Sequence, residues 1–384
     1  MDQKETKKTI RIFALASFLN DLGSDMIYPI WPLFVTSVLG ANMVVLGFID
    51  GLGEAIVSIS YAISGYISDR IRKRKVFIWI GYLFGSLSRI GYAISSTWQY
   101  LIPFKVLDRA GKIRSAPRDA IIADISTKEN RGKHFGLLRT MDNLGAVCGI
   151  IVCILFFGLL GYRNLFLIAA IPSAIGALLI LALIKEKKPA DVRIYKGLSI
   201  KDLDKNFKLF FLLSSFFALG SFSYSFLLVY AKEFSFKIAF VPILYLIFTT
   251  VASAVSLPFG RLSDKIGRKL VLMLSYIFWG LACLTFIFIQ THLAIILAFI
   301  LYGLYKGALE PVQKAFVSEL APLQYRASSL GGFQMAIGLC ALPASFVAGI
   351  LWDKIGVFAP FYFSLSLTFL SIIMLIFVKE KQIS

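Results

Sequence analysis

The sequence predicts an all-α membrane protein with twelve transmembrane helices in two pseudo-symmetric six-helix bundles. Three observations support this fold class: the chain is strongly apolar, its basic residues recur in alternate loops, and one loop motif occurs twice, 195 residues apart, at Gly65 and Gly260. The mean hydropathy is +0.78, and 58% of the 384 residues are hydrophobic. A soluble domain of this size could not cover so much apolar surface with polar groups.

Each predicted span is a continuous apolar run. A transmembrane helix needs roughly 20 mostly apolar residues, and twelve stretches of the chain meet this requirement. A transmembrane strand would instead show alternating apolar and polar side chains over about ten residues. The predicted spans are 11–36, 43–68, 76–97, 99–122, 134–158, 164–184, 208–231, 240–261, 270–290, 293–316, 328–350 and 357–378.

The loops between the spans alternate between basic and nearly neutral. The basic loops contain Lys4, Lys7, Lys8 and Arg11; Arg70 to Lys75; Lys128, Arg131 and Lys133; Lys185 to Lys208; Arg261 to Lys269; and Lys379 and Lys381. This positive-inside pattern predicts an inner (plasma) membrane protein whose two termini are cytoplasmic. Basic loops beside anionic lipid headgroups also explain the net charge of +18 without a nucleic-acid partner.

Other classes of site find no support in the sequence. The four cysteines all fall inside predicted spans and form no Cys-x-x-Cys pair, so neither a disulfide nor a metal site is expected. The chain has no Gly-x-x-x-x-Gly-Lys-Ser/Thr motif to cradle a phosphate, and Gly51-Leu52-Gly53 lies within a predicted helix rather than after a strand. We therefore expect no cofactor and no enzymatic activity. The apolar stretch after Arg11 is too long for a signal peptide and is predicted to be the first span.

The repeated loop motif divides the chain into halves. We predict an N-terminal bundle over residues 1–184, a cytoplasmic linker over 185–207 and a C-terminal bundle over 208–384. The same offset relates Asp124 to Glu319, so the repeat extends beyond the loop. An even number of spans in each half makes the halves parallel repeats. Substrate is then expected near the bilayer midplane between the halves, with alternating access by rocking of one half against the other.

The repeated motif carries a family resemblance. It is Gly65-Tyr66-Ile67-Ser68-Asp69-Arg70 in the first half and Gly260-Arg261-Leu262-Ser263-Asp264-Lys265 in the second, each followed by further basic residues. With these residues the chain resembles the major facilitator superfamily of transporters over its whole length. The family signature is Gly-x-x-x-Asp-Arg/Lys-x-Gly-Arg-Arg/Lys; residues 260–269 fit it throughout, and the first copy departs at Arg72, where the family prefers Gly. The resemblance implies a secondary transporter in which each polypeptide contains a complete transport pathway. The protein is therefore expected to be a monomer.

Glycine and proline positions are similar to motifs of the twelve-helix drug:proton antiporters. Leu22-Gly23 followed by Pro29 and Pro32 is similar to the first-helix motif, with one extra residue between the prolines. The fifth-helix motif is partly present: Gly145 and Gly149 match, but Ile150 stands where that motif has proline. Residues 108–119 resemble a bacterial and archaeal branch of the superfamily whose substrates are mostly unassigned.

Ionisable side chains within the spans are the candidate coupling and cavity residues. Each costs roughly 2.5–3.5 kcal/mol at mid-bilayer on insertion scales and so requires a reason. Most lie in the first half, and Asp21 and Asp25, like Asp50 and Glu54, are spaced to share a helix face. The candidates are Asp21, Asp25, Asp50, Glu54, Arg89, Lys105, Asp108, Arg109 and Lys112, with Lys306 and Glu310 in the second half.

We interpret these charges as a proton relay. Two carboxylates close together in a low-dielectric environment repel each other and can share one proton, which a basic neighbour such as Arg109 can displace. The alternative is that the charges pair internally and only hold helices together. Arg114 and Arg118 are expected to be structural and to extend toward the cytoplasmic water. The second half presents mainly Phe, Tyr and Ser, which favours hydrophobic substrate contacts there.

The repeated loops are predicted to form a cytoplasmic gate. The resemblance implies that Asp69 lies near the start of the eleventh helix, where a carboxylate meets the positive end of a helix dipole. Arg70 and Arg74 can reach Asp124, and Arg131 completes this cluster. The alternative is that these loops only follow the positive-inside rule. This would explain the basic residues but not Asp69 and Asp264, the acids at matched positions of the two loops. The predicted gate residues are Gly65, Asp69, Arg70, Arg74, Asp124 and Arg131, with Gly260, Asp264, Lys265, Arg268, Glu319 and Arg326 in the second half.

The functional expectation is proton-coupled efflux of amphipathic small molecules by alternating access. The alternative is proton-coupled uptake or export of an anionic metabolite or siderophore. The cations that could bind a carboxylate or phosphate are Arg89, Lys105, Arg109, Lys112 and Lys306. The ion pairs of the intramembrane cations distinguish these two hypotheses. If every cation is paired with an acid, efflux is favoured; if two or more cations are unpaired, transport of an anion is favoured. A channel or a receptor is a third class, and neither needs a duplicated gate. The expected partners are a small-molecule substrate, protons and the lipid bilayer.

Overall fold

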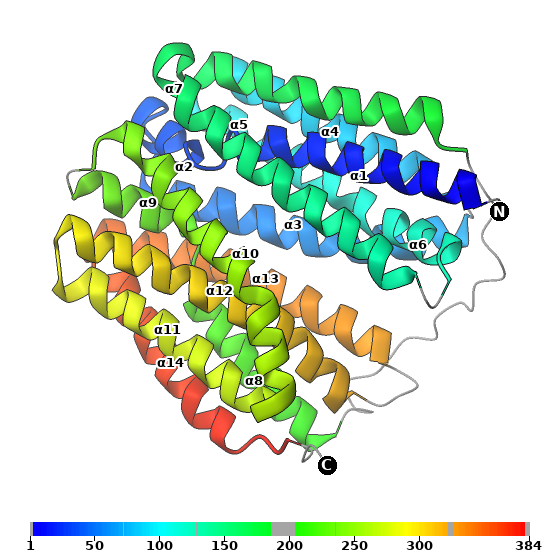
Figure 1. The fold of residues 1–384 in the computed structure, drawn as a ribbon. Coiled ribbons are helices and arrows are strands. Elements are labelled where there is room, and N and C mark those ends of the chain that lie inside the picture. Colours follow the sequence, from blue (N-terminus) through cyan, green and yellow to red (C-terminus); the bar gives the residue numbers. More distant parts are fainter. Residues whose placement is uncertain are drawn as a thin grey trace. The chain divides into compact units, whose positions relative to one another are not determined.

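The computed structural model describes residues 3–71, 73–127, 130–185, 204–234, 236–321 and 326–380. Within these residues the backbone forms helices and connecting turns, without a strand (Figure 1). The side chains of residues 3, 4, 69, 131, 132 and 326–328 are not described. The predicted linker over 185–207 lies outside the described residues except at its two ends.

The described helices account for the twelve predicted spans. Within the described residues, nine helical stretches are long and apolar enough to cross a membrane. One of them, Lys133–Leu183, holds two spans, because Gly161 adopts a positive φ of 68° and reverses the chain. The remaining two spans are the first helix, which carries charges at both ends, and the fourth, which is interrupted in its middle. The all-helical, twelve-span fold class is therefore confirmed.

The first compact unit comprises Met1–Gly40 and Ile56–Tyr195. The second part of α3 (Met43–Arg70) belongs to this unit. Its other elements are α1 (Gln3–Asp25), α2 (Trp31–Leu33), the π-helix η1 (Phe34–Val38), α4 (Lys75–Ile94), α5 (Trp98–Ala110), the 3-10 helix η2 (Gly111–Arg114), α6 (Ser115–Ile125) and α7 (Arg131–Leu183).

The second compact unit comprises Ala41–Ala55 and Lys196–Ser384, and so includes the first part of α3. Its helices are α8 (Lys205–Gly220), α9 (Tyr224–Glu233), the 3-10 helix η4 (Ile238–Phe240), α10 (Val241–Ile266), α11 (Arg268–Phe288), α12 (His292–Leu320), α13 (Arg326–Lys354) and α14 (Ala359–Ile376). Helices α8 and α9 form one span that is broken at residues 221–223.

Two glycines let α1 and α7 pack closely in the first unit. A Cβ at Gly145 would overlap the carbonyl oxygen of Phe18, and one at Gly149 would overlap that of Leu22. Small residues at such crossings allow membrane helices to approach each other at backbone distance. The two glycines of the fifth-helix motif therefore hold the first and fifth spans together.

Aromatic rings fill much of the interior of the second unit. Phe217 of α8 stacks on Tyr276 of α11 with ring centroids 4.0 Å apart. Trp279 lies 5.6 Å from Tyr302 and 5.3 Å from Tyr305 of α12. Offset and edge-to-face pairs of this kind each add about 0.5–1.5 kcal/mol beyond their buried area. The Phe and Tyr residues of the second half therefore form its core to a large extent.

The expectation of one uninterrupted helix over 99–122 is wrong. The chain forms α5, then a 3-10 turn at Gly111–Arg114, and then α6. The break lies where Gly111 meets Gly81 of α4, so closely that a Cβ on either glycine would overlap the other's carbonyl oxygen. A 3-10 segment advances more degrees per residue than an α-helix. The charged residues on the two sides of this turn, from Lys105 to Asp119, therefore do not share one helix face.

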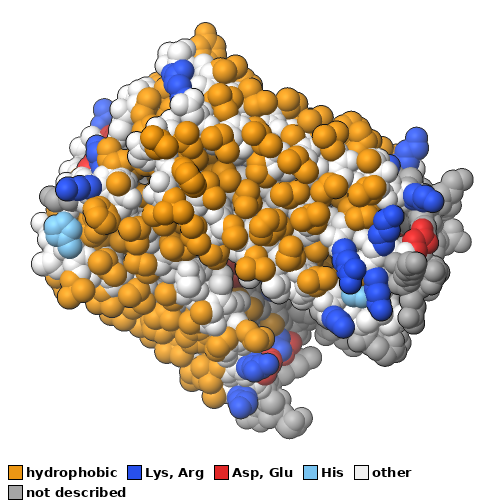
Figure 2. Space-filling view, turned by 45° about the horizontal axis from the view of Figure 1, so that its top comes forward, with side chains coloured by type: hydrophobic (Ala, Val, Ile, Leu, Met, Phe, Trp, Pro, Cys, Tyr) orange, Lys and Arg blue, Asp and Glu red, His pale blue; other side chains and the backbone are white. Residues whose placement is uncertain are grey.

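The outer surface of α7 is apolar over much of its two spans. Leu155, Leu159 and Leu178 are 67%, 82% and 62% exposed. Figure 2 shows hydrophobic side chains covering most of one face, with Lys and Arg gathered toward its ends. A surface of this kind is suited to the hydrocarbon core of a bilayer, because exposure of so large an apolar patch to water is unfavourable. The chain is therefore an integral membrane protein.

Candidate functional site

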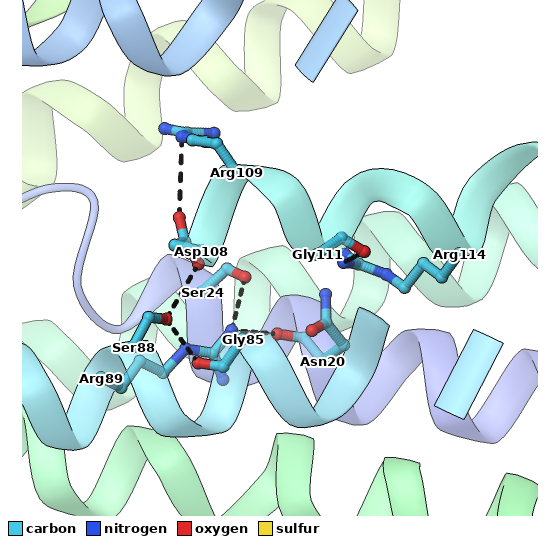
Figure 3. A network of polar contacts seen from close by, with 9 residues as sticks. All are labelled: Asn20, Ser24, Gly85, Ser88, Arg89, Asp108, Arg109, Gly111 and Arg114. Carbon is cyan, nitrogen blue, oxygen red and sulfur yellow. Dashed lines mark hydrogen bonds and ion pairs between the residues drawn. The ribbon is translucent and has the colours of Figure 1, made fainter. Parts of the chain in front are cut away.

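Arg89 of α4 forms the centre of a buried polar network in the first unit (Figure 3). The residue is 2% exposed. Its Nη1 donates to the Ala169 carbonyl at 2.8 Å and to the Ser173 hydroxyl, both on α7. Its Nη2 donates to the Ser24 hydroxyl at 2.8 Å and to the Asn20 carbonyl at 3.2 Å, both on α1. Four neutral acceptors thus hold Arg89, which makes it a clamp between three helices rather than an open anion ligand.

The glycine at position 23 makes room for this clamp. A Cβ there would overlap both the Arg89 guanidinium and the carbonyl of Ala169. Ser173 also donates to the side chain of Asn20 at 3.1 Å, which closes the network between α7 and α1. The Leu22-Gly23 pair of the first-helix motif therefore has a direct packing reason in this chain.

Asp108 and Arg109 lie at the end of α5 beside this network (Figure 3). Arg109 Nε is 3.6 Å from Asp108 Oδ2, and the two side chains are 12% and 10% exposed. The Ser88 hydroxyl is 3.4 Å from Asp108 Oδ1. The Arg109 guanidinium also lies 5.1 Å from the ring centroid of Tyr28. Asp108 and Arg109 thus form a buried charge pair that contacts α4 and the turn after α1.

Lys105 is another buried cation of α5. It is 2% exposed, and its Nζ lies 4.0 Å from the ring centroid of Trp31 in α2. A cation over an indole face is stabilised by the ring quadrupole, by about 2 kcal/mol or more when it is desolvated. The contact with the Trp31 ring therefore helps to stabilise the charge of Lys105. The pattern of charges in the sequence did not predict this aromatic partner.

A second group of charges surrounds Asp142 of α7. Its Oδ1 is buried and has no hydrogen-bond partner among the described residues. The charges that act on it electrostatically are Asp21 of α1, Arg118 of α6, Arg139 of α7 and Lys112 of η2. Asp21 accepts a hydrogen bond from Asn20 at 2.8 Å. The predicted site did not include Asp142, although an acid inside a span is a signal that could have found it.

The neighbouring arginines lie inside the unit, contrary to the expectation that they extend toward water. Arg114 is 6% exposed, donates to the Gly111 carbonyl at 2.8 Å and lies over the ring of Tyr82. Arg118 donates to the Ser17 hydroxyl at 2.7 Å and pairs with Asp119 at 3.0 Å. The 3-10 turn sends both side chains back toward α1 and α4, where acceptors and an aromatic face receive them.

The acidic residues of the first two spans differ in environment. Asp25 is 8% exposed, at the end of α1. Asp50 is 7% exposed and accepts hydrogen bonds from the hydroxyls of Ser223, at 2.8 Å, and Ser225. These serines begin α9, so Asp50 also meets the positive end of a helix dipole at the break in the seventh span. Glu54, one turn further along α3, is exposed.

Lys306 of α12 is the predicted site cation of the second unit, and its side chain is half-buried. Its Nζ lies 5.3 Å from the ring centroid of Tyr305 and 5.8 Å from that of Tyr302. Glu310 and Glu54 are the carboxylates that act on it electrostatically, and both are exposed. Two aromatic rings therefore lie near the Lys306 ammonium, in addition to the two exposed carboxylates that act on it.

The loop after α3 is attached to the end of α6. Arg74 Nη1 contacts Asp124 Oδ2 at 2.5 Å, and the side chains are 7% and 52% exposed. Arg70 is exposed, and a Cβ at Gly65 would make ordinary van der Waals contact with Ala116. The side chains of Asp69 and Arg131, the other two predicted gate residues of this half, lie outside the described part.

The second loop makes an equivalent attachment through a different residue of the motif. Arg268 contacts Glu319 of α12 at 3.0 Å and Asp264 at 3.3 Å. Gly267 has a φ of 100°, which is why this position of the signature favours glycine. Lys265 is exposed, Gly260 has open space beside it, and the side chain of Arg326 lies outside the described part.

The start of α11 is also capped by the C-terminal segment. The Glu380 carboxylate accepts from the backbone N–H of Arg268 at 2.5 Å and from that of Lys269 at 3.2 Å. The Lys269 ammonium in return donates to the carbonyls of Ile376 and Val378 at the end of α14. A carboxylate at a helix start and a cation at a helix end both match the helix dipole. Nothing in the repeat predicts Glu380, since it lies outside the duplicated motif.

The family follows from comparison with known proteins. The model of the Major Facilitator Superfamily matches residues 13–228 and 209–384. An uncharacterised MFS-type transporter of Methanocaldococcus jannaschii, MJ1317, is 40% identical over 98% of this chain and 96% of its own length. The multi-drug resistance efflux pump PmrA of Streptococcus pneumoniae is 27% identical over 84% of each chain. The crystal structure of the nucleoside transporter NupG has a TM-score of 0.74 at 17% identity, covering 96% of this chain and 97% of that one. The chain belongs to the Major Facilitator Superfamily of transporters.

Proposed function

We propose that the protein is a proton-coupled transporter that exports amphipathic small molecules across the inner membrane by alternating access. The observation that carries this proposal is the concentration of buried ionisable groups in the first unit, around Asp108, Arg109 and Asp142. Buried charges of this kind mark proton or ion pathways in transporters. A likeness to a protein described as a multi-drug efflux pump supports the direction of transport. The distribution of basic loops supports a cytoplasmic location for both termini.

Aromatic side chains support an apolar, amphipathic substrate. In the second unit Tyr302 and Tyr305 lie beside Lys306 and are 3% and 1% exposed, so we expect a substrate to reach these rings only when the unit rearranges. Faces of aromatic rings contact flat apolar molecules and cations without requiring specific hydrogen bonds. A carrier that accepts several amphipathic compounds needs contacts of this tolerant kind.

Transport of an anionic metabolite is the second candidate, and Lys112 favours it. Among the described residues Lys112 makes no hydrogen bond or ion pair of 4 Å or less, although Asp21 and Asp108 act on it electrostatically. An ammonium without a close partner can bind a carboxylate or phosphate. Arg89 does not add to this case, because four neutral acceptors already occupy its guanidinium.

Purified protein in liposomes tests the proposal. An inside-acidic pH gradient is expected to drive accumulation of an amphipathic fluorescent cation such as ethidium, because protons leaving the lumen exchange for the dye. Collapse of the gradient with nigericin should stop accumulation, and Asp25→Asn should reduce it to the level of empty liposomes. Gradient-driven uptake of citrate with no movement of ethidium would instead support the anionic candidate. Solute counterflow separates a carrier from a channel, since only a carrier exchanges labelled for unlabelled solute.

We further propose that the two loop attachments form a cytoplasmic gate that rearranges during transport. Arg74→Gln and Arg268→Gln each remove the ion pair that fixes a loop to the end of its own bundle. Each variant is expected to shift the conformational equilibrium, seen as a changed distance distribution between spin labels on the cytoplasmic ends of α6 and α12. Lys73→Gln is the matched control, since it removes the same charge from an exposed residue of the same loop that is not a predicted gate residue. Distributions identical to wild type in both gate variants would contradict the gate.

A further inference from the structure

A surface groove lies between the start of α1 and the end of α7, both in the first unit. Its volume is about 600 Å³. Exposed cations line one part of it: Lys7, Lys8 and Arg11. The groove is absent from the sites considered so far, since none of these residues contributes to the charge network around Arg89 or Asp142.

The remaining lining of the groove is apolar apart from one carboxylate. Leu15 and Leu183 are 43% and 46% exposed, and Ile12 and Leu179 complete the apolar wall. Glu5 lines the basic part, so three cations and one acid lie there together. The groove is thus amphipathic along its length, basic toward the helix ends and apolar toward the middle of the spans.

The position of the groove along the spans matches the boundary of a bilayer. On α1 the charged segment ends at Arg11 and the apolar run begins at Ile12. On α7 the apolar span ends at Leu183, two residues before Lys185. Both helices therefore change from apolar to charged at the level of the groove, which is where lipid headgroups meet acyl chains.

We propose that this groove binds one anionic phospholipid. The phosphate lies against Lys7, Lys8 and Arg11, and an acyl chain lies over Leu15, Leu179 and Leu183. Charge complementarity selects this occupant over a zwitterionic lipid, since each basic side chain near an anionic headgroup strengthens its binding. The apolar wall favours a phospholipid over free phosphate, because only the lipid has an acyl chain that can pack against the leucines. The groove is continuous with the lipid-facing surface of α7, where Leu178 and Leu181 are also exposed.

The test compares lipid binding by purified full-length protein in a neutral detergent, measured by native mass spectrometry. Phosphatidylglycerol is expected to bind at least about tenfold more tightly than phosphatidylcholine. Lys7→Gln/Lys8→Gln/Arg11→Gln should abolish this preference. Lys232→Gln/Lys237→Gln/Lys354→Gln is the matched control, because it removes the same charge from loops expected on the opposite side of the membrane. This control should retain the preference.

A second pair of measurements separates a lipid from a free anion. Leu15→Ser/Leu183→Ser keeps all three cations and should weaken phosphatidylglycerol binding. Glycerol phosphate, the soluble headgroup analogue, should not compete with the lipid. Competition by glycerol phosphate, or unchanged lipid binding in the leucine variant, would show an anion site without a lipid and overturn the proposal. Equal binding of the two lipids by the wild-type protein would overturn it without recourse to any variant.

Discussion

Asp142→Asn is expected to abolish proton-driven transport in liposomes, a loss of about 100-fold or more, while the protein remains folded. The reason is the position of its Oδ1, which is buried and accepts no hydrogen bond from the described residues. Such an atom can hold a proton, and Asp21 and Lys112 are among the charges that can set when the proton leaves. An amide of the same shape cannot bind or release a proton at neutral pH. The measurement is pH-gradient-driven accumulation of a fluorescent substrate.

Asp119→Asn is the matched control for Asp142→Asn. It removes one carboxylate from the same region, but its partner is Arg118, at 3.0 Å, and its side chain is 33% exposed. Gradient-driven transport should persist in this control at close to the wild-type rate. Counterflow without a proton gradient gives a second readout, because loss of coupling alone leaves substrate exchange intact. Wild-type gradient-driven transport by Asp142→Asn would exclude this residue as a proton carrier.

Arg89→Ala is expected to destabilise the protein by roughly 3–5 kcal/mol. The change removes four hydrogen bonds that join α4 to α1 and α7. Interhelical hydrogen bonds in membranes contribute about 0.6 kcal/mol each on average, and the cavity left by a large buried side chain adds to the loss. The measurement is thermal unfolding in detergent, where the unfolding temperature of the variant should fall well below that of wild type.

Arg89→Lys separates the charge of this side chain from its geometry. Lysine retains the positive charge but cannot span two acceptors on α7 and two on α1 with a planar fork. An unfolding temperature between those of Arg89→Ala and wild type is therefore expected. If Arg89→Lys unfolds at the wild-type temperature, charge alone accounts for the role of Arg89, and the clamp between three helices is not needed.

The predicted elements were those with strong local signals. Continuous apolar runs predict spans because a bilayer imposes nearly the same length on every helix that crosses it. The break at Gly111–Arg114 was not predictable in this way, because it depends on the contact between Gly111 and Gly81 of another helix. The turn at Gly161 was within reach of the sequence, which places a glycine between two predicted spans.

The sequence predicts which ionisable residues lie within the spans but not which residues they contact. Intramembrane charges are visible in the sequence because each is costly in lipid. Their partners depend on helices that are distant along the chain: neutral acceptors for Arg89, an indole ring for Lys105 and serine hydroxyls for Asp50. That Oδ1 of Asp142 accepts no hydrogen bond from the described residues could be recognised only once the surrounding side chains were placed.

The sequence by itself determined the class of protein, the number of spans and the duplication of the loop motif, since hydropathy and repeats are properties of the chain read in order. Tertiary structure alone decided what each charge contacts. Arg89 became a clamp rather than an anion ligand, and Arg268 rather than Lys269 pairs with Glu319, although Lys269 is the repeat equivalent of Arg74. The physical reason is that the strength of an electrostatic or hydrogen-bonding contact depends on distance and burial, which helix packing sets and periodicity does not.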